Sequence, residues 1–281
     1  MTITAGKKTI TAGKSFRFQA SAGERTSDIT WSVSNKKIGT ISKTGLFKAK
    51  RKGSVTIVAA CGGQTAKYKV NVVGKKLIGI DAGHQSKGNS KLEAVGPGAK
   101  SKKAKVAGGT AGVYSRVPEY ELTLEIALEV KEELLDRGYD VVLTRFKNNV
   151  DISNKERAEL INDSGADICI RLHADGASSS SAKGASALYP STKNKYVSEL
   201  SKESMKLGKS VLDAYCDETG RRNRGLVARD DLTGTNWSKV PVIVLEMGFM
   251  TNKSDDTYMQ TEKGQKAMVK GIADGIDDYY K

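Results

Sequence analysis

Histidine is nearly absent from this sequence, with two copies among 281 residues, and cysteine and proline number only three and four. Cys61, Cys169 and Cys216 lie far apart without a C-x-x-C pair, which excludes a disulfide framework and a thiolate zinc cluster; Cys169, within "ICI", is expected to be buried. No apolar run approaches the roughly 20 residues of a transmembrane helix. The first residues lack the apolar core of a secretory leader, so either the protein is not exported by that route or the chain is a trimmed form.

Acidic residues are almost missing from the first part of the chain. Residues 1–74 hold 14 Lys and Arg against 2 Asp and Glu, whereas residues 75–281 hold 32 against 30. Such an imbalance is typical of two domains with different partners. Gly74, Lys75 and Lys76 form a short link, so we predict domains at 1–74 and 75–281.

The first domain lacks a helical period and instead shows short alternating runs such as "SFRFQA", "ITWSV" and "SVTIVAA", which predict several strands of a β-sandwich. The segment "ITWSVSNKKIGTISKTGLFKAKRKGSVTIVAA" resembles the bacterial immunoglobulin-like group 2 domain, over about residues 2–73. The resemblance implies an N-terminal all-β Ig-like sandwich, of a kind that acts as a spacer or adhesive module outside the cell. Phe16, Phe18 and Trp31 are expected in its core.

In the second domain, apolar strand-like runs alternate with helical patterns. This alternation predicts an α/β fold, with a mostly parallel twisted sheet flanked by helices on both faces. Ser153 and Glu156 form a capping box. We expect helices over 118–137, 154–164 and 195–219. We expect a long loop over 85–116.

Both histidines follow the end of an apolar strand, His84 in "LIGIDAGH" and His173 in "DICIRLHAD". The carboxyl ends of strands in α/β sheets are where sites collect. If the two strands are neighbours, both imidazoles enter one crevice, and neutral imidazole is a common zinc ligand. The alternative is two unrelated histidines, each with local hydrogen bonds.

A catalytic zinc site usually has three protein ligands, and two histidines with one glutamate form a known set. Glu119 opens the long helix, where the helix dipole also favours an acid, and its position alone does not distinguish it from Glu121 or Glu125. Glu246 follows a buried apolar strand in "VIVLEMGF". A carboxylate there is costly without a partner or a task, so it is either a base for a metal-bound water or a structural partner of an arginine.

Residues 76–280 resemble the zinc-dependent N-acetylmuramoyl-L-alanine amidases of family 3. The matching segments, in the family's order, are "IGIDAGH", "EYELTLEIALEVKEELLDRGYDVVLTR", "ERAELINDSGADICIRLHAD", "RGLVARDDL" and "VPVIVLEMGFMTN". The resemblance implies that His84, Glu119 and His173 bind Zn²⁺ and that Glu246 is the catalytic acid/base. Many members have D-P-G-H-G-G where this chain has "DAGHQS", and the loop after it is longer and more basic here, so fine specificity does not transfer.

The implied reaction is hydrolysis of the amide bond between N-acetylmuramic acid and L-alanine in peptidoglycan, by an enzyme outside the cell or associated with the wall. Arg229 would hold an oxyanion or a substrate carboxylate, or else form a salt bridge on a loop. Asp81 would orient His84 or cap a turn. In the same way, Asp175 would orient His173 or cap a turn.

Two rival functions are compatible with parts of the sequence, and a third is disfavoured. The basic first domain could anchor a non-catalytic protein to anionic wall polymers. The site could belong to a zinc carboxypeptidase or deacetylase that acts on the same polymer. Specific nucleic-acid binding is disfavoured, because only "KAKRK" at 48–52 is densely basic and the aromatic residues belong to the core.

Overall fold

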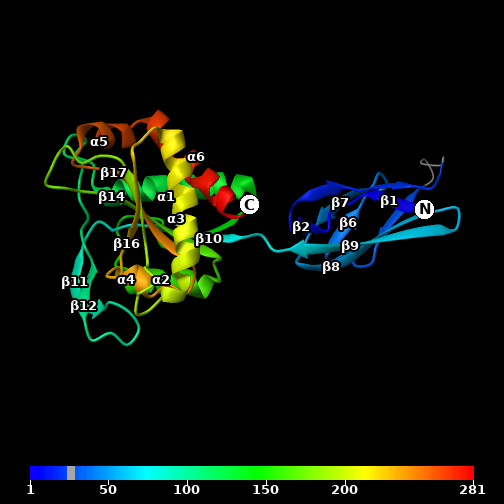
Figure 1. Cartoon of the computed structure of the whole chain (residues 1–281), viewed down its shortest axis with the longest axis horizontal. Coiled ribbons are helices and arrows are strands. Elements are labelled where there is room, and N and C mark those ends of the chain that lie inside the picture. Colours follow the sequence, from blue (N-terminus) through cyan, green and yellow to red (C-terminus); the bar gives the residue numbers. More distant parts are fainter. Residues whose placement is uncertain (24–28) are drawn as a thin grey trace. The chain divides into compact units, whose positions relative to one another are not determined.

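The computed structural model describes residues 1–23 and 29–281. The chain forms two compact units, Met1–Lys76 and Leu77–Lys281 (Figure 1). The division falls beside the predicted boundary at Gly74 and Lys75. No helix in the described part of the chain combines the length and the apolar character needed to cross a bilayer.

The first unit is all-β, as the sequence predicts. Its strands pair as a sheet ordered β2-β9-β8-β5, a sheet ordered β3-β7-β6, and a β1-β4 ladder. Phe18 and Phe47 are fully buried between the sheets, and Phe16 and Trp31 pack against them partly exposed. The strands are β1 Thr2–Ala5, β2 Thr9–Thr11, β3 Ser15–Arg17, β4 Gln19–Ser21, β5 Thr30–Val33, β6 Gly39–Ile41, β7 Leu46–Ala49, β8 Gly53–Cys61 and β9 Gln64–Val73.

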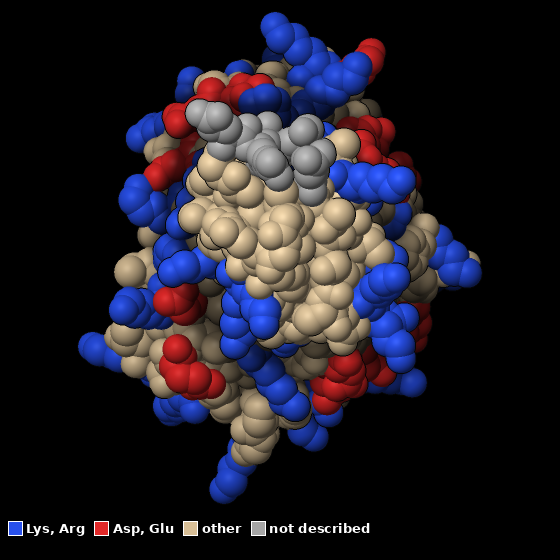
Figure 2. All heavy atoms as spheres, turned by 90° about the vertical axis from the view of Figure 1, so that its right-hand side faces the viewer, with Lys and Arg blue, Asp and Glu red and all other residues tan. Residues whose placement is uncertain are grey.

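The charged side chains in the described part of the first unit are all basic. Every Lys and Arg in its described residues is exposed, and its two acidic residues, Glu24 and Asp28, lie outside the described ranges. Figure 2 shows a broad uncharged area at the centre of the face it draws, with Lys and Arg side chains scattered around it and some Asp and Glu among them. This spread is typical of a diffuse electrostatic surface.

The second unit is built on a six-stranded sheet ordered β13-β10-β14-β17-β15-β16. The first four strands run parallel, while β15 pairs with β17 in the antiparallel sense and with β16 in the parallel sense. The sheet is therefore mostly parallel, as predicted. Its strands are β10 Leu77–Ala82, β13 Asp140–Leu143, β14 Ile168–Asp175, β15 Ala185–Tyr189, β16 Asn223–Ala228 and β17 Val242–Phe249.

Helices cover both faces of this sheet because its strands are apolar on both sides. Ile78, Ile80 and Leu172 pack with α1, α3 and α6 on one face. On the other face, Ile161 of α2 packs over Gly79, where an added Cβ would approach the Ile161 side chain to 2.8 Å. The helices are α1 Glu119–Arg137, α2 Asn154–Ser164, α3 Ser201–Thr219, α4 Thr233–Asn236, α5 Lys253–Met259 and α6 Glu262–Tyr279, with a 3₁₀ turn at Ser198–Leu200.

Two expectations need correction. The predicted loop 85–116 contains an antiparallel hairpin of β11, Asn89–Ala94, and β12, Lys102–Val106. Its strands are largely exposed and polar, so they lack the hydrophobic alternation that marks a strand. The helix expected over 195–219 begins only at Ser201, after a separate 3₁₀ turn.

Candidate metal centre

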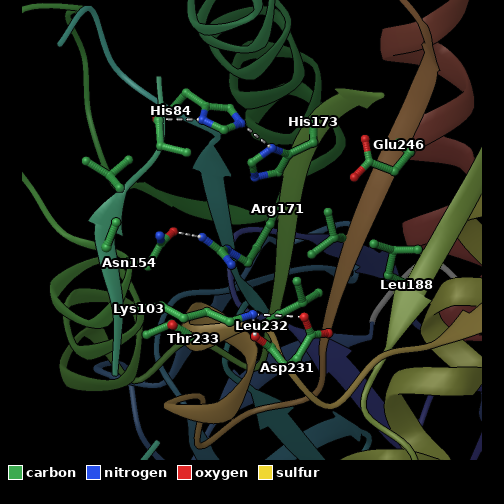
Figure 3. Close-up of a pocket in the computed structure, with 14 residues that line it drawn as sticks. His84, Lys103, Asn154, Arg171, His173, Leu188, Asp231, Leu232, Thr233 and Glu246 are labelled. Carbon is green, nitrogen blue, oxygen red and sulfur yellow. Dashed lines mark hydrogen bonds and ion pairs between the residues drawn. The ribbon is translucent and has the colours of Figure 1, made fainter. Parts of the chain in front are cut away.

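The two histidines meet because their strands are neighbours. β10 and β14 pair in parallel, with Ala82 opposite Leu172. His84 lies two residues beyond Ala82 and His173 one residue beyond Leu172, so both imidazoles leave the same edge of the sheet (Figure 3). Their ring centroids are 4.7 Å apart. The structure thus provides the juxtaposition that the sequence pattern required.

Glu119 joins them as the first residue of α1. Pro118 precedes it as the N-cap, and its extended backbone ends the loop before the helix starts. Thr123 of the same helix donates to the carbonyl of Gly83, 2.8 Å away, which ties the helix start to the turn that carries His84. Glu121 and Glu125, which position alone left open, do not belong to the ligand group.

The three side chains present their ligand atoms as a small triangle. Nε2 of His84 lies 3.1 Å from Nδ1 of His173, and Oε1 of Glu119 lies 3.2 Å and 3.0 Å from these two nitrogens. Donor atoms of a tetrahedral zinc site, each about 2.0–2.2 Å from the ion, are separated by roughly 3.3 Å. The residues present therefore fit a tetrahedral ion with one position left for another ligand.

Hydrogen bonds with backbone groups fix the orientation of His84 and Glu119. Nδ1 of His84 donates to the carbonyl of Ala107 at 2.9 Å, which leaves Nε2 free to bind a cation. Oε1 of Glu119 accepts from the amide of Ala174 at 3.1 Å, and Oε2 from that of Thr110 at 2.9 Å. Metal-binding side chains usually have such partners, because the partners fix the ring tautomer and the carboxylate orientation.

His84 also has an unusual backbone conformation. Its φ is 59°, in the left-handed region that non-glycine residues rarely adopt. Such a conformation costs on the order of 1–3 kcal/mol and persists where the surroundings enforce it. Here Nη2 of Arg157 donates to the His84 carbonyl at 2.7 Å and helps hold the turn.

The charges of the triangle are coupled. Burial opposes ionisation of Glu119, but hydrogen bonds from His173 and His84 outweigh it and hold the pKa of the carboxyl well below its usual range. Burial lowers the pKa of His173, whereas the Glu119 carboxylate overcomes burial at His84 and raises its pKa. An anionic carboxylate between two imidazoles is a suitable donor set for a divalent cation, which would displace a proton on binding.

Glu246 lies on β17 directly opposite His173 in the sheet register. Its carboxylate points toward the same opening as the two histidines (Figure 3). Burial, reinforced by the charges of Glu119 and Asp175, raises its pKa well above the ordinary value. Among residues 1–23 and 29–281, no group forms a hydrogen bond or ion pair with this carboxylate, so the arginine partner considered from the sequence does not occur there.

The other predicted residues have different partners. Arg229 forms a two-contact ion pair with Asp231, at 2.8 and 3.1 Å, which matches the salt-bridge alternative. The carboxylate of Asp175 accepts from the amide of Gly176. Asp81 was expected to orient His84 or cap a turn, but its oxygens accept from Thr144, Arg157 and Arg171. Its link to His84 therefore passes through Arg157.

Sequence reasoning missed the buried arginines below the ligand group. Arg157 is 1% exposed and Arg171 6% exposed, and both bind Asp81, whose pKa they lower against the effect of burial. The available signal was Arg171 itself, a charged residue inside the apolar run "ICIRL". A charge within a buried strand requires a partner or a task.

Comparisons with known proteins agree with this geometry. A family model described as N-acetylmuramoyl-L-alanine amidase matches residues 78–278, and one described as bacterial Ig-like domain (group 2) matches residues 1–72. The chain is 28% identical over 214 residues to an N-acetylmuramoyl-L-alanine amidase of Mycobacterium tuberculosis, covering 72% of this chain and 87% of that protein. It is 29% identical over 163 residues to the amidase LytC of Bacillus subtilis, covering 58% of this chain and 31% of that protein.

Solved structures show the same fold for the second unit. An N-acetylmuramoyl-L-alanine amidase from Clostridium difficile is 26% identical with a TM-score of 0.59, over 73% of this chain and 97% of that one. An amidase from Mycobacterium smegmatis is 24% identical with a TM-score of 0.66, over 73% of this chain and 96% of that one. These likenesses cover the α/β unit that carries the ligand triangle.

Proposed function

Because this chain belongs to the N-acetylmuramoyl-L-alanine amidase family, we propose that it is a zinc-dependent hydrolase of the amide bond between N-acetylmuramic acid and L-alanine in peptidoglycan. The observation that carries the proposal is the triangle of His84, Glu119 and His173, whose ligand atoms lie 3.0–3.2 Å apart. Glu246 lies beside them and forms no ion pair within the described residues. The family supports the substrate, and the donor set supports the metal.

In this proposal His84, Glu119 and His173 hold the ion. A bound zinc ion would supply Lewis-acid chemistry of the kind that lowers the pKa of water toward ~7 and polarises a carbonyl. Glu246 takes the proton from the attacking water and later delivers it to the departing amine. Its raised pKa suits both tasks, because a carboxyl that titrates closer to neutrality both accepts and releases a proton readily.

We also propose that the protein acts outside the cell or at the wall, as cell-wall amidases do. The basic first unit would strengthen attachment to anionic wall polymers through its exposed Lys and Arg. That unit belongs to a domain type found in extracellular proteins, which supports the same location.

Mass spectrometry of digested muropeptides tests the reaction. We expect products in which intact N-acetylmuramic acid is separated from peptides with a free L-alanine amino group, together with about one zinc per chain by elemental analysis. Glu246→Gln should keep the zinc and lose activity by about 10²–10⁴-fold, the usual contribution of a general base. Release of a terminal amino acid or of acetate would instead identify a carboxypeptidase or a deacetylase.

A further inference from the structure

The guanidinium of Arg171 is buried, yet one of its ends has no partner. Its side chain is 7% exposed, Nε donates to Asp81 at 2.7 Å, and Nη2 donates to Asn154 at 2.7 Å. Nη1 has no hydrogen-bond partner in the described chain. Arg171 lines a cavity of about 460 Å³ that also contains His84, His173 and Glu246 (Figure 3). An arginine N–H group that is open to a cavity and has no partner is available to a ligand.

The acids near Arg171 leave its Nη1 without a carboxylate partner in the described chain. Asp81 is shared between Arg157 and Arg171, at 2.8 and 2.7 Å, so one carboxylate serves two guanidinium groups. Asp231 also lines the cavity, but Lys103 and Arg229 already pair with it. Glu246 lines the same cavity and its charge interacts with that of Arg171, but no ion pair or hydrogen bond joins the two side chains in the described chain. Nη1 of Arg171 therefore stays available to an anionic group of a ligand.

We propose that Nη1 of Arg171 binds a carboxylate of the peptide that leaves when the amide is cut. The inference rests on the proposed function, because it identifies which part of that substrate enters this cavity. The carboxyl group of the muramoyl lactyl ether is consumed in the amide bond. A carboxylate in this substrate therefore belongs to the peptide on the amine side. Thr233, whose hydroxyl has no hydrogen-bond partner in the described residues, lies in the same wall and is a second donor.

This assignment also fixes the direction of the substrate. A second hollow, of about 550 Å³, shares His84, His173 and Glu246 with the first, and Thr110, Asp175 and Thr251 line it elsewhere. Hydroxyl and carboxylate groups suit the hydroxyls of a sugar. With the peptide carboxylate on Arg171, the muramoyl sugar lies in the second hollow and the scissile carbonyl lies between them, at the ligand triangle.

Two synthetic muramoyl-dipeptides test the proposal. They differ in one group: the second residue carries a free α-carboxylate in one and the corresponding carboxamide in the other. Wild-type protein should show a KM roughly 10- to 100-fold lower for the carboxylate substrate, the usual effect of a charge-assisted hydrogen bond. Calorimetric binding of the two free leaving dipeptides should show the same preference without turnover.

Variants separate the role of Arg171 from general effects. Arg171→Gln should raise KM for the carboxylate substrate until the two substrates differ by less than about twofold, with little change in kcat. Arg171→Lys keeps the charge without the planar fork and should retain part of the preference. Lys209→Gln, which removes one charge from an exposed position on α3, should leave the preference unchanged.

Equal KM values for both substrates with wild-type protein would overturn the inference alone, whether or not the variants fold. An equal loss of kcat for both substrates in Arg171→Gln would also overturn it, because that result indicates stabilisation of the reacting oxygen. Failure to cleave either substrate would overturn the proposed function together with the inference. A preference that disappears in Arg171→Gln and persists in Lys209→Gln supports it.

Discussion

Glu246 differs from the three predicted ligands in that its carboxylate has no hydrogen bond or ion pair in the described chain, although the charges of Arg229 and Arg171 partly offset the rise in its pKa. Its raised pKa follows first from burial and then from the charges of Glu119 and Asp175. A general base must be deprotonated, so the raised pKa limits activity on the acidic side of the pH profile. A substitution that lowers the pKa of Glu246 should therefore extend activity toward lower pH.

Asp175→Asn removes one of these charges while keeping an oxygen that accepts from Gly176. The pKa of Glu246 should fall, and the acidic limb of kcat/KM should move to lower pH by roughly half a unit to one unit. The measurement is kcat/KM for a soluble muramoyl-peptide between pH 4 and pH 8. Asp163→Asn, at an exposed position on α2, is the matched control and should not move the limb. An unmoved limb in Asp175→Asn would show that Asp175 does not influence the base.

At the level of elements, the hairpin of β11 and β12 is part of the site's framework. The indole of Trp237 donates to the carbonyl of Ala94 at 2.9 Å, and Asn154 donates to that of Lys105 at 2.8 Å. The chain that leaves the hairpin then supplies the carbonyl of Ala107 to His84. These bonds hold the hairpin beside the cavity, where residues of β12 form part of the cavity wall.

Gly109 tests this framework. It has φ +80°, and an added Cβ would approach Cγ of His84 to 2.9 Å and Oε2 of Glu119 to 3.0 Å. Gly109→Ala should displace both side chains and weaken zinc binding by at least about tenfold, as loss of an orienting partner does. Gly98→Ala is the matched control, because Gly98 has φ +71° with nothing within 4 Å. Competition with a fluorescent zinc chelator measures both. Equal affinities in the two variants would show that Gly109 does not support the ligands.

The sequence predicted elements best where local chemistry determines them. The helix at 154–164 has the predicted capping box of Ser153 and Glu156, and α1 ends at Gly138 in the left-handed conformation. The hairpin escaped prediction because its support comes from Trp237 and Asp231, far along the chain. The antiparallel pairing of β15 with β17 could not be predicted, because no local sequence pattern specifies which strands pair or in which direction.

The candidate site divides in the same way. The positions of His84, His173 and Glu246 at strand ends were visible in the sequence, whereas the choice of Glu119 needed the family resemblance. The role of Arg171 required the structure, because its free end and its cavity depend on segments distant in sequence. Residues that act through three-dimensional neighbours leave only a weak local signal.

At the scale of the whole molecule, the two units differ sharply in charge. The "KAKRK" segment contributes Lys48, Lys50, Arg51 and Lys52, all exposed. Replacing these four by Gln in the full chain should reduce retention on purified cell walls at ~50 mM salt by several-fold. The difference should vanish near 1 M salt, where the screening length is about 3 Å. Hydrolysis of a soluble muramoyl-peptide should remain unchanged. Retention that is equal at low salt would exclude this segment from wall attachment.

The most direct test of the account is an anomalous diffraction experiment at the zinc absorption edge, on crystals of the full chain grown with one equivalent of zinc. We expect one strong peak at about 2.0–2.2 Å from Nε2 of His84, Oε1 of Glu119 and Nδ1 of His173. A zinc peak at another site, with none between these three atoms, would contradict it.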